Sequence, residues 1–210
     1  MPLIPETMNE KRIEIIEKVR ELYDKYGIRS VTMDDVVHEM GISKKTLYQY
    51  FSDKTELVSA VMDSAYEKRK NSMISALEGN ENAVEEMLTY YGLQMKMIKD
   101  HKPTVIYDLR KYYPEIYAKV TDRKRNHIYE SVLLNLKRGK KESLYRDDIN
   151  EEIIARMNLM RVEAIMSSGI FTHEEIMAPA FFKEIFTYHM YGIVNDKGRK
   201  ILEQNLDKFI

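Results

Sequence analysis

The residues between Glu39 and Asp53 carry the side chains best suited to contact DNA. This stretch contains no acidic residue, although acids slightly outnumber bases in the whole chain, at 34 against 33. Lysine, threonine and glutamine side chains suit base edges, and tyrosine hydroxyls and ammonium groups suit phosphates. The side chains of this kind are Ser43, Lys44, Lys45, Thr46, Tyr48, Gln49, Tyr50 and the following Lys54. We therefore expect a locally positive face that binds double-stranded DNA.

Two short helices joined by a tight turn should present this face. Apolar spacing predicts helices at about residues 33–40 and 44–51, and Gly41 supplies the positive φ that the reversal needs. Thr32 and Ser43 have the side chains of N-cap residues. A first helix from Thr7 to Gly27 and a long helix from about residue 53 to residue 77 should complete the small core of this helix-turn-helix unit.

The same segment closely resembles the DNA-binding domain of the TetR/AcrR regulators. The similarity runs without gaps from about Arg12 to Val61 and includes the motif Gly-Ile-Ser-Lys-Lys-Thr-Leu-Tyr-Gln-Tyr-Phe at residues 41–51. One position departs, because Val37 stands where the family usually has alanine. The larger side chain should push the two short helices slightly apart, unless a smaller partner elsewhere absorbs it. The resemblance implies a homodimer, a double-stranded operator of two half-sites, and a helical C-terminal domain whose small-molecule effector weakens DNA binding.

The resemblance also assigns roles on the DNA face. The positions that read bases are Lys44, Lys45, Thr46 and Gln49. Those that contact phosphates are Thr32, Tyr48, Tyr50 and Lys54, and we place Ser43 with them. Two alternatives remain open: Tyr48 and Tyr50 as packing residues, and Lys44 and Lys45 as a merely solvated first turn. Cations at a helix N-terminus oppose the macrodipole, however, and DNA phosphate would account for them.

Helical periodicity continues to the C-terminus. We expect further helices at about residues 82–99, 103–112, 114–136, 150–167, 180–193 and 196–207, and a mobile loop at Lys137–Arg146. The predicted fold class is all-α: an N-terminal three-helix helix-turn-helix domain, residues 1–53, joined by a long helix to a C-terminal helical ligand-binding and dimerisation domain, residues 54–210.

Methionine and tyrosine are frequent after residue 82, and together they can line an adaptable pocket for a mostly apolar ligand. The candidate pocket residues are Met87, Tyr90, Tyr91, Met95, Tyr107, Tyr113, Met157 and Met160. The alternative is that these residues are simply core. Two later helices have strongly apolar faces and lie where the family forms an intersubunit four-helix bundle. The candidate dimer residues are Met157, Ile165, Phe181, Phe182, Ile185, Phe186 and His189.

Composition and motifs argue against several other classes of protein. The chain has 210 residues, 44% of them hydrophobic, and no cysteine, so thiolate chemistry and disulfides are excluded. The five histidines lack metal-ligand spacing, and no glycine-rich phosphate loop is present. We therefore expect no enzyme activity, metal or cofactor. No apolar run approaches the roughly 18 residues of a membrane span, so we expect a cytoplasmic protein. The alternative is a helical small-molecule-binding protein or enzyme with an inherited DNA-binding head. We expect a repressor, with activation as the alternative.

Overall fold

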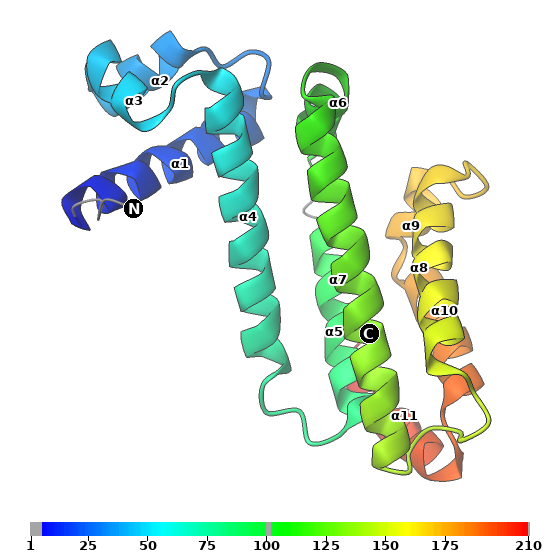
Figure 1. The fold of residues 1–210 in the computed structure, drawn as a ribbon. Helices are drawn as coiled ribbons and strands as arrows, with labels where there is room; N and C mark the ends of the chain where they lie inside the picture. Colours follow the sequence, from blue (N-terminus) through cyan, green and yellow to red (C-terminus); the bar gives the residue numbers. More distant parts are fainter. Residues whose placement is uncertain (1–5, 100–101, 210) are drawn as a thin grey trace. The chain divides into compact units, whose positions relative to one another are not determined.

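The computed structural model describes residues 6–99 and 102–209, and this part of the chain is all-α (Figure 1). Within it no strand forms, although Tyr145 and Val194 make an isolated antiparallel bridge. No helix in the described ranges combines the length and the apolar character needed to cross a membrane. The helices are α1 Glu6–Tyr26, α2 Met33–Met40, α3 Lys44–Tyr50, α4 Lys54–Leu77, α5 Ala83–Lys99, α6 Pro103–Tyr112, α7 Pro114–Lys141, α8 Glu151–Ser167, α9 His173–Met177, α10 Pro179–Ile193 and α11 Asp196–Phe209.

The chain forms two compact units. The first comprises Met1–Asn71 and Lys102–Asp122, and the second comprises Ser72–His101 and Arg123–Ile210. Helices α4 and α7 each contribute residues to both units. The expected border between residues 53 and 54 falls inside the first unit, at the start of α4, and as a functional border it stays a prediction.

The core of the first unit is built on one face of α1. Ile15, Val19 and Tyr23 from this helix are buried, and they pack in one apolar cluster with Leu47 and Phe51. Val105 and Leu109 of α6 belong to the same cluster. Helix α1 ends at Gly27, whose φ of +82° provides the left-handed residue that commonly closes a helix. The predicted start at Thr7 is close to the observed one, but the Thr7 side chain lies outside the described residues.

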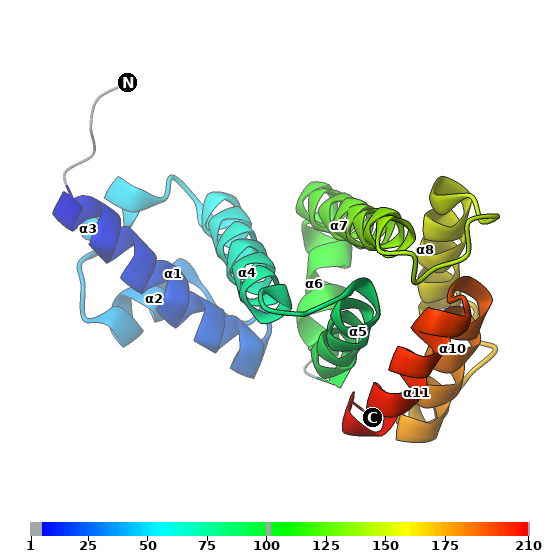
Figure 2. The ribbon, with the colours of Figure 1, turned by 90° about the horizontal axis from the view of Figure 1, so that it is seen from below.

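The core of the second unit joins α5, α7, α8, α10 and α11. Met87 and Tyr91 from α5 pack with Leu136 from α7, Phe186 from α10 and Leu202 from α11. Figure 2 shows α11 lying against α5, which agrees with their contacts. These helices bury their apolar stripes against one another, so the second unit has a core of its own.

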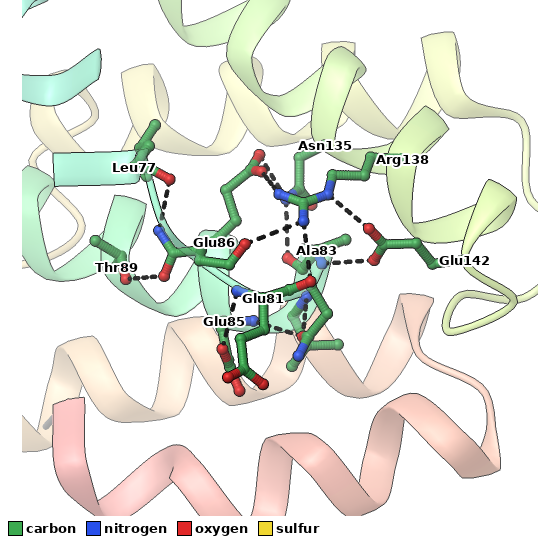
Figure 3. Close-up of polar contacts among 12 residues, drawn as sticks. Leu77, Glu81, Ala83, Glu85, Glu86, Thr89, Asn135, Arg138 and Glu142 are labelled. Atoms are coloured by element: carbon green, nitrogen blue, oxygen red, sulfur yellow. Dashed lines mark hydrogen bonds and ion pairs between the residues drawn. The ribbon is translucent and has the colours of Figure 1, made fainter. Parts of the chain in front are cut away.

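The expected mobile loop at Lys137–Arg146 is wrong, because α7 continues to Lys141. Figure 3 shows the reason: the Arg138 guanidinium lies between the carboxylates of Glu86 and Glu142. Its Nε donates to Glu142 Oε1 at 2.6 Å, and its Nη2 donates to the carbonyl oxygen of Asn80 at 3.1 Å. A charged segment without apolar periodicity is thus ordered by partners far away in the sequence.

Tyr145 anchors the end of the same segment. Its side chain is fully buried, and its hydroxyl lies 2.9 Å from the carbonyl oxygen of Ala83 and 2.8 Å from Asn135 Oδ1. The ring packs on Gly139, where an added Cβ would lie 2.1 Å from Tyr145 Cδ2. Glycine is therefore required at position 139 by close packing rather than by backbone conformation.

Helix α9 was not expected, although its start carries a local signal. Thr172 Oγ1 accepts a hydrogen bond from the Glu175 amide at 3.2 Å, and Glu175 Oε2 accepts one from the Thr172 amide at 2.7 Å. This reciprocal pair is a capping box, and it satisfies amides that a short helix leaves without partners. The acidic pair Glu174 and Glu175 therefore belongs to a helix start.

Candidate nucleic-acid interface

The turn between α2 and α3 is fixed by capping interactions. Thr32 Oγ1 accepts from the Asp35 amide at 3.1 Å, while Asp35 Oδ2 accepts from the Thr32 amide at 2.7 Å. The hydrogen bond from the Thr32 amide, with that from the Thr32 hydroxyl, lowers the pKa of the Asp35 carboxyl. Gly41 adopts φ +61° at the C-terminus of α2, and Ser43 Oγ accepts from the Thr46 amide at 3.0 Å. The predicted N-caps and the glycine turn are confirmed.

Helix α3 buries one side and exposes the other. Leu47 is completely buried in the core of the first unit, and Phe51 follows it there. The opposite side presents Lys44, Lys45, Tyr48 and Gln49 to solvent, whereas Thr46 and Tyr50 are half-buried. The structure therefore brings the predicted base-reading side chains onto one short helix with an outward face. Their contact with bases stays a prediction.

The two lysines at the start of α3 differ in their surroundings. Lys44 Nζ lies 2.9 Å from Asp34 Oδ1, and this hydrogen bond and charge raise the pKa of Lys44. Both side chains are about two-thirds exposed, at 63% and 65%, so the pair is weak and can be exchanged for another anion. Within the described part of the chain, Lys45 has no ion-pair partner. Lys45 is thus the cation of this face that is most available to a phosphate or a base.

The predicted phosphate-contacting residues around α3 differ in their exposure and in the hydrogen bonds that they already make. Tyr48 is 49% exposed, but Tyr50 packs partly against the core, so its packing role is real. Lys54 Nζ donates to the carbonyl oxygen of Arg29 at 3.3 Å, and partial burial lowers its pKa against the opposing charges of Asp108 and Asp35. The hydroxyls of Thr32 and Ser43 are already engaged in caps.

Sequence reasoning missed a polar link between α6 and the segment that precedes α2. Asp108 is buried, and its Oδ2 accepts from the Arg29 amide at 2.8 Å. Arg29 Nη1 also donates to the Tyr112 hydroxyl at 2.7 Å, and its guanidinium lies 5.0 Å from the centre of that ring. A Cβ at Gly27 would approach Asp108 Oδ2 to 3.0 Å. The sequence signal that could have indicated this link is an acidic residue, Asp108, on the apolar face of α6.

A mostly apolar pocket lies in the second unit and takes residues from five helices. Its cavity volume is about 70 Å³. Three of the eight predicted pocket residues line it, namely Tyr90, Tyr91 and Met95 on α5. Four predicted dimer residues also line it: Ile165, Phe181, Phe182 and Ile185. The lining residues that sequence reasoning missed are Gln94, Ile128, Asn158, Arg161, Val162 and Ile176.

The other predicted residues lie elsewhere. Met87 and Phe186 are core residues at 1% exposure each, and His189 stacks on Tyr91 with ring centres 6.0 Å apart. Tyr107 and Tyr113 belong to the first unit, not to the unit that holds this pocket.

Met157 and Met160 are more than half exposed on α8. Neither residue lines the pocket. Their exposure agrees with the dimer assignment of Met157 but does not test it.

The fold and this surface define a class: a helix-turn-helix DNA-binding domain within an all-α chain. Residues 15–61 match the sequence model described as bacterial regulatory proteins, tetR family. This helix-turn-helix part of the chain is therefore similar to that family of regulators. An uncharacterised HTH-type transcriptional regulator of Mycobacterium tuberculosis is 42% identical over 53 residues, which are 25% of this chain and 22% of that protein. The HTH-type transcriptional regulator TtgR of Pseudomonas putida is 34% identical over 62 residues, 30% of each chain.

The match to curated relatives therefore spans less than a third of their length. The fold extends further. The crystal structure of a TetR-family transcriptional regulator from Cytophaga hutchinsonii aligns with 94% of this chain and 100% of its own, with a TM-score of 0.69 and 15% identity. The C-terminal part therefore shares its fold with such regulators, while its sequence has diverged.

Proposed function

We propose that this protein is a sequence-specific DNA-binding transcriptional regulator, and a repressor that leaves its operator when a small, mostly apolar ligand binds. The outward face of α3 carries the proposal. Its side chains offer donors and acceptors, its buried side is locked into a core, and its dimensions suit the major groove. A catalytic role is not part of this function.

Lys45 and Gln49 are the best placed base readers, with Lys44 and Thr46 beside them at the start of α3. Lys44 would exchange Asp34 for DNA, because an exposed ion pair contributes little. Tyr48, Tyr50 and Lys54 would hold phosphates at the flanks. Thr32 and Ser43 would serve chiefly by capping α2 and α3, so that the helix N-termini present backbone amides to phosphate oxygens.

A homodimer would supply the second recognition helix. Several large apolar side chains on α8 and α10 are exposed in the single chain: Ile153, Met157, Met160, Tyr188 and Tyr191. An apolar patch of this kind indicates a protein contact. A twofold axis would place two α3 helices in major grooves one helical turn apart, about 34–36 Å. Such a regulator would work in the cytoplasm, where operator DNA is accessible.

The pocket in the second unit is the proposed effector site. Apolar and aromatic side chains form most of its wall, and a few polar groups from α5 and α8 converge on it. This composition is typical of sites for small organic ligands. The proposal takes the ligand's body to be apolar, in line with the phenylalanine and isoleucine side chains of α8 and α10.

The test is the salt dependence of DNA affinity, measured by fluorescence anisotropy on duplex DNA from the region upstream of the gene. Lys54→Ala should lower the slope of log K against log salt by about 0.9 per monomer, because one phosphate contact is lost. Lys200→Ala, which removes an equal charge from the exposed side of α11, is the matched control and should leave the slope unchanged. Equal slopes for Lys54→Ala and the wild type would reject the assigned contact. No binding at all, together with turnover of a substrate, would favour the enzyme alternative.

A further inference from the structure

Arg161 is a half-buried cation in the wall of the apolar pocket. Its Nη1 donates to the carbonyl oxygen of Ile185 at 2.9 Å, and its Nη2 donates to the Tyr91 hydroxyl and to Asn158 Oδ1, each at 2.5 Å. These contacts hold the guanidinium between α5, α8 and α10. Its Nε is buried and has no hydrogen-bond partner in the protein.

All three acceptors of Arg161 are neutral. Among the described residues, no carboxylate lies within ion-pair distance of its guanidinium. Burial raises the pKa of Tyr91 to about 12, so this phenol carries no negative charge at neutral pH. Burial, helped by the charge of Arg161, lowers the pKa of His189 to about 3, so its ring is neutral as well. The positive charge of Arg161 is therefore hydrogen-bonded but not compensated.

A half-buried charge without a counter-ion is only partly solvated, so a ligand that carries the opposite charge would be attracted to it. The guanidinium can still donate to a carboxylate oxygen, because its Nε–H has no partner in the protein and hydrogen bonds between opposite charges are strong. Apolar side chains complete the surroundings, including Ile128, Val162 and Phe182. A ligand would thus contact one positive charge in an otherwise mostly apolar wall.

We propose that this pocket binds an amphipathic monoanion, a carboxylate on an aliphatic or aromatic body, with Arg161 as its counter-ion. This inference rests on the proposed function only in taking the pocket as the effector site. The carboxylate lies against the Nε side of the guanidinium, and the apolar body lies among the side chains of α7, α8 and α10. A neutral ligand leaves the charge uncompensated, and a cationic ligand is repelled.

The test compares probes of equal chain length by isothermal titration calorimetry with the intact protein. Decanoate should bind about tenfold to a hundredfold more tightly than decanol, as a charge-assisted hydrogen bond predicts, and decylamine should bind most weakly. Decanesulfonate distinguishes a preference for carboxylate from a preference for any monoanion, and binding equal to that of decanoate would overturn the carboxylate assignment. These comparisons use the wild-type protein and do not depend on the folding of a variant.

Variants then assign the effect to Arg161. Arg161→Met should remove the preference for decanoate over decanol while leaving decanol affinity unchanged or higher. Arg161→Lys keeps the charge but not the planar donors, and should retain part of the preference. Arg156→Met, which changes an exposed arginine of the same helix, should bind like the wild type.

Two results would overturn the inference: decanoate and decanol binding equally to the wild type, or Arg161→Met keeping the preference. Equal binding of decanoate and decanol would reject the anion preference but would still agree with an effector site for apolar ligands. Failure of every probe to bind would reject both the anion and the effector site. Decanoate that binds through Arg161 but leaves DNA affinity unchanged would support the anion site and reject release by the ligand.

Discussion

Two arginines of the second unit hold helices together in different ways. Arg138 lies between Glu86 and Glu142, and it also bonds to main-chain oxygens before α5. Arg161 bonds to three neutral acceptors and has an unpaired Nε. The positive charge of Arg138 is compensated by carboxylates within the fold, whereas that of Arg161 is not. The difference separates a residue that completes the structure from one that is available to a ligand.

The largest effect should come from Arg138→Met. The variant leaves the half-buried carboxylates of Glu86 and Glu142 without their cation, and we expect the free energy of unfolding to fall by about 2–4 kcal/mol. The lower end applies because roughly a third of the arginine side chain is exposed. Chemical denaturation measures the change. Arg156→Met breaks only an exposed pair with Glu152 and should cost about 0.5 kcal/mol or less. Equal losses in the two variants would contradict the structural role of Arg138.

An intermediate effect should appear in the pH dependence of stability near Arg161. The pKa of His189 in the folded protein is about 3, below the ordinary 6.5, so the unfolded chain takes up a proton that the folded chain refuses. His189 therefore destabilises the fold as the pH falls from 6.5 towards 3, and this loss is absent above 6.5. Between pH 7 and pH 5.5 we expect a loss of about 1 kcal/mol relative to His189→Phe.

The control for this prediction is His173→Phe, which changes an exposed histidine of α9 and should keep the slope of the wild type. Denaturation curves at several pH values provide the measurement. An identical slope for His189→Phe and the wild type would show that His189 is not held neutral beside Arg161.

The smallest change in stability should come from Arg161→Met without ligand. Removal of an uncompensated cation offsets the loss of its three hydrogen bonds, and Tyr91 and Asn158 can still bond to each other, with their oxygens 2.6 Å apart. We expect the free energy of unfolding to stay within about 1 kcal/mol of the wild type. A loss as large as that of Arg138→Met would erase the distinction between the two arginines.

The N-terminal unit was predictable because its determinants are local. Thr32 caps the amide of Asp35, and Ser43 caps the amide of Thr46, three residues on in each case. Gly41 carries the positive φ that the turn requires. Such short spacings can be recognised in a sequence, and so the position of α3 and its outward face followed from it. The bond between Arg29 and Asp108 joins residues 79 positions apart, and it did not follow.

The second unit depends on contacts between distant residues. The segment at residues 137–146 looked like a loop because its charges showed no helical stripe, yet Arg138 and Tyr145 find partners on α5 and before it. The richness in methionine and tyrosine indicated a pocket and located Tyr90, Tyr91 and Met95. Arg161 could not be told apart from a solvated residue of α8, because its partners Tyr91 and Ile185 lie on α5 and α10.

Selection of binding sites from random double-stranded DNA is the most direct test of the proposed regulator. The purified protein should enrich a sequence with two inverted half-sites, and Gln49→Ala should relax the preference at one base position in each half-site while keeping the rest. Enrichment of no sequence by the wild type, or an unchanged preference in Gln49→Ala, would contradict reading of DNA by the outward face of α3.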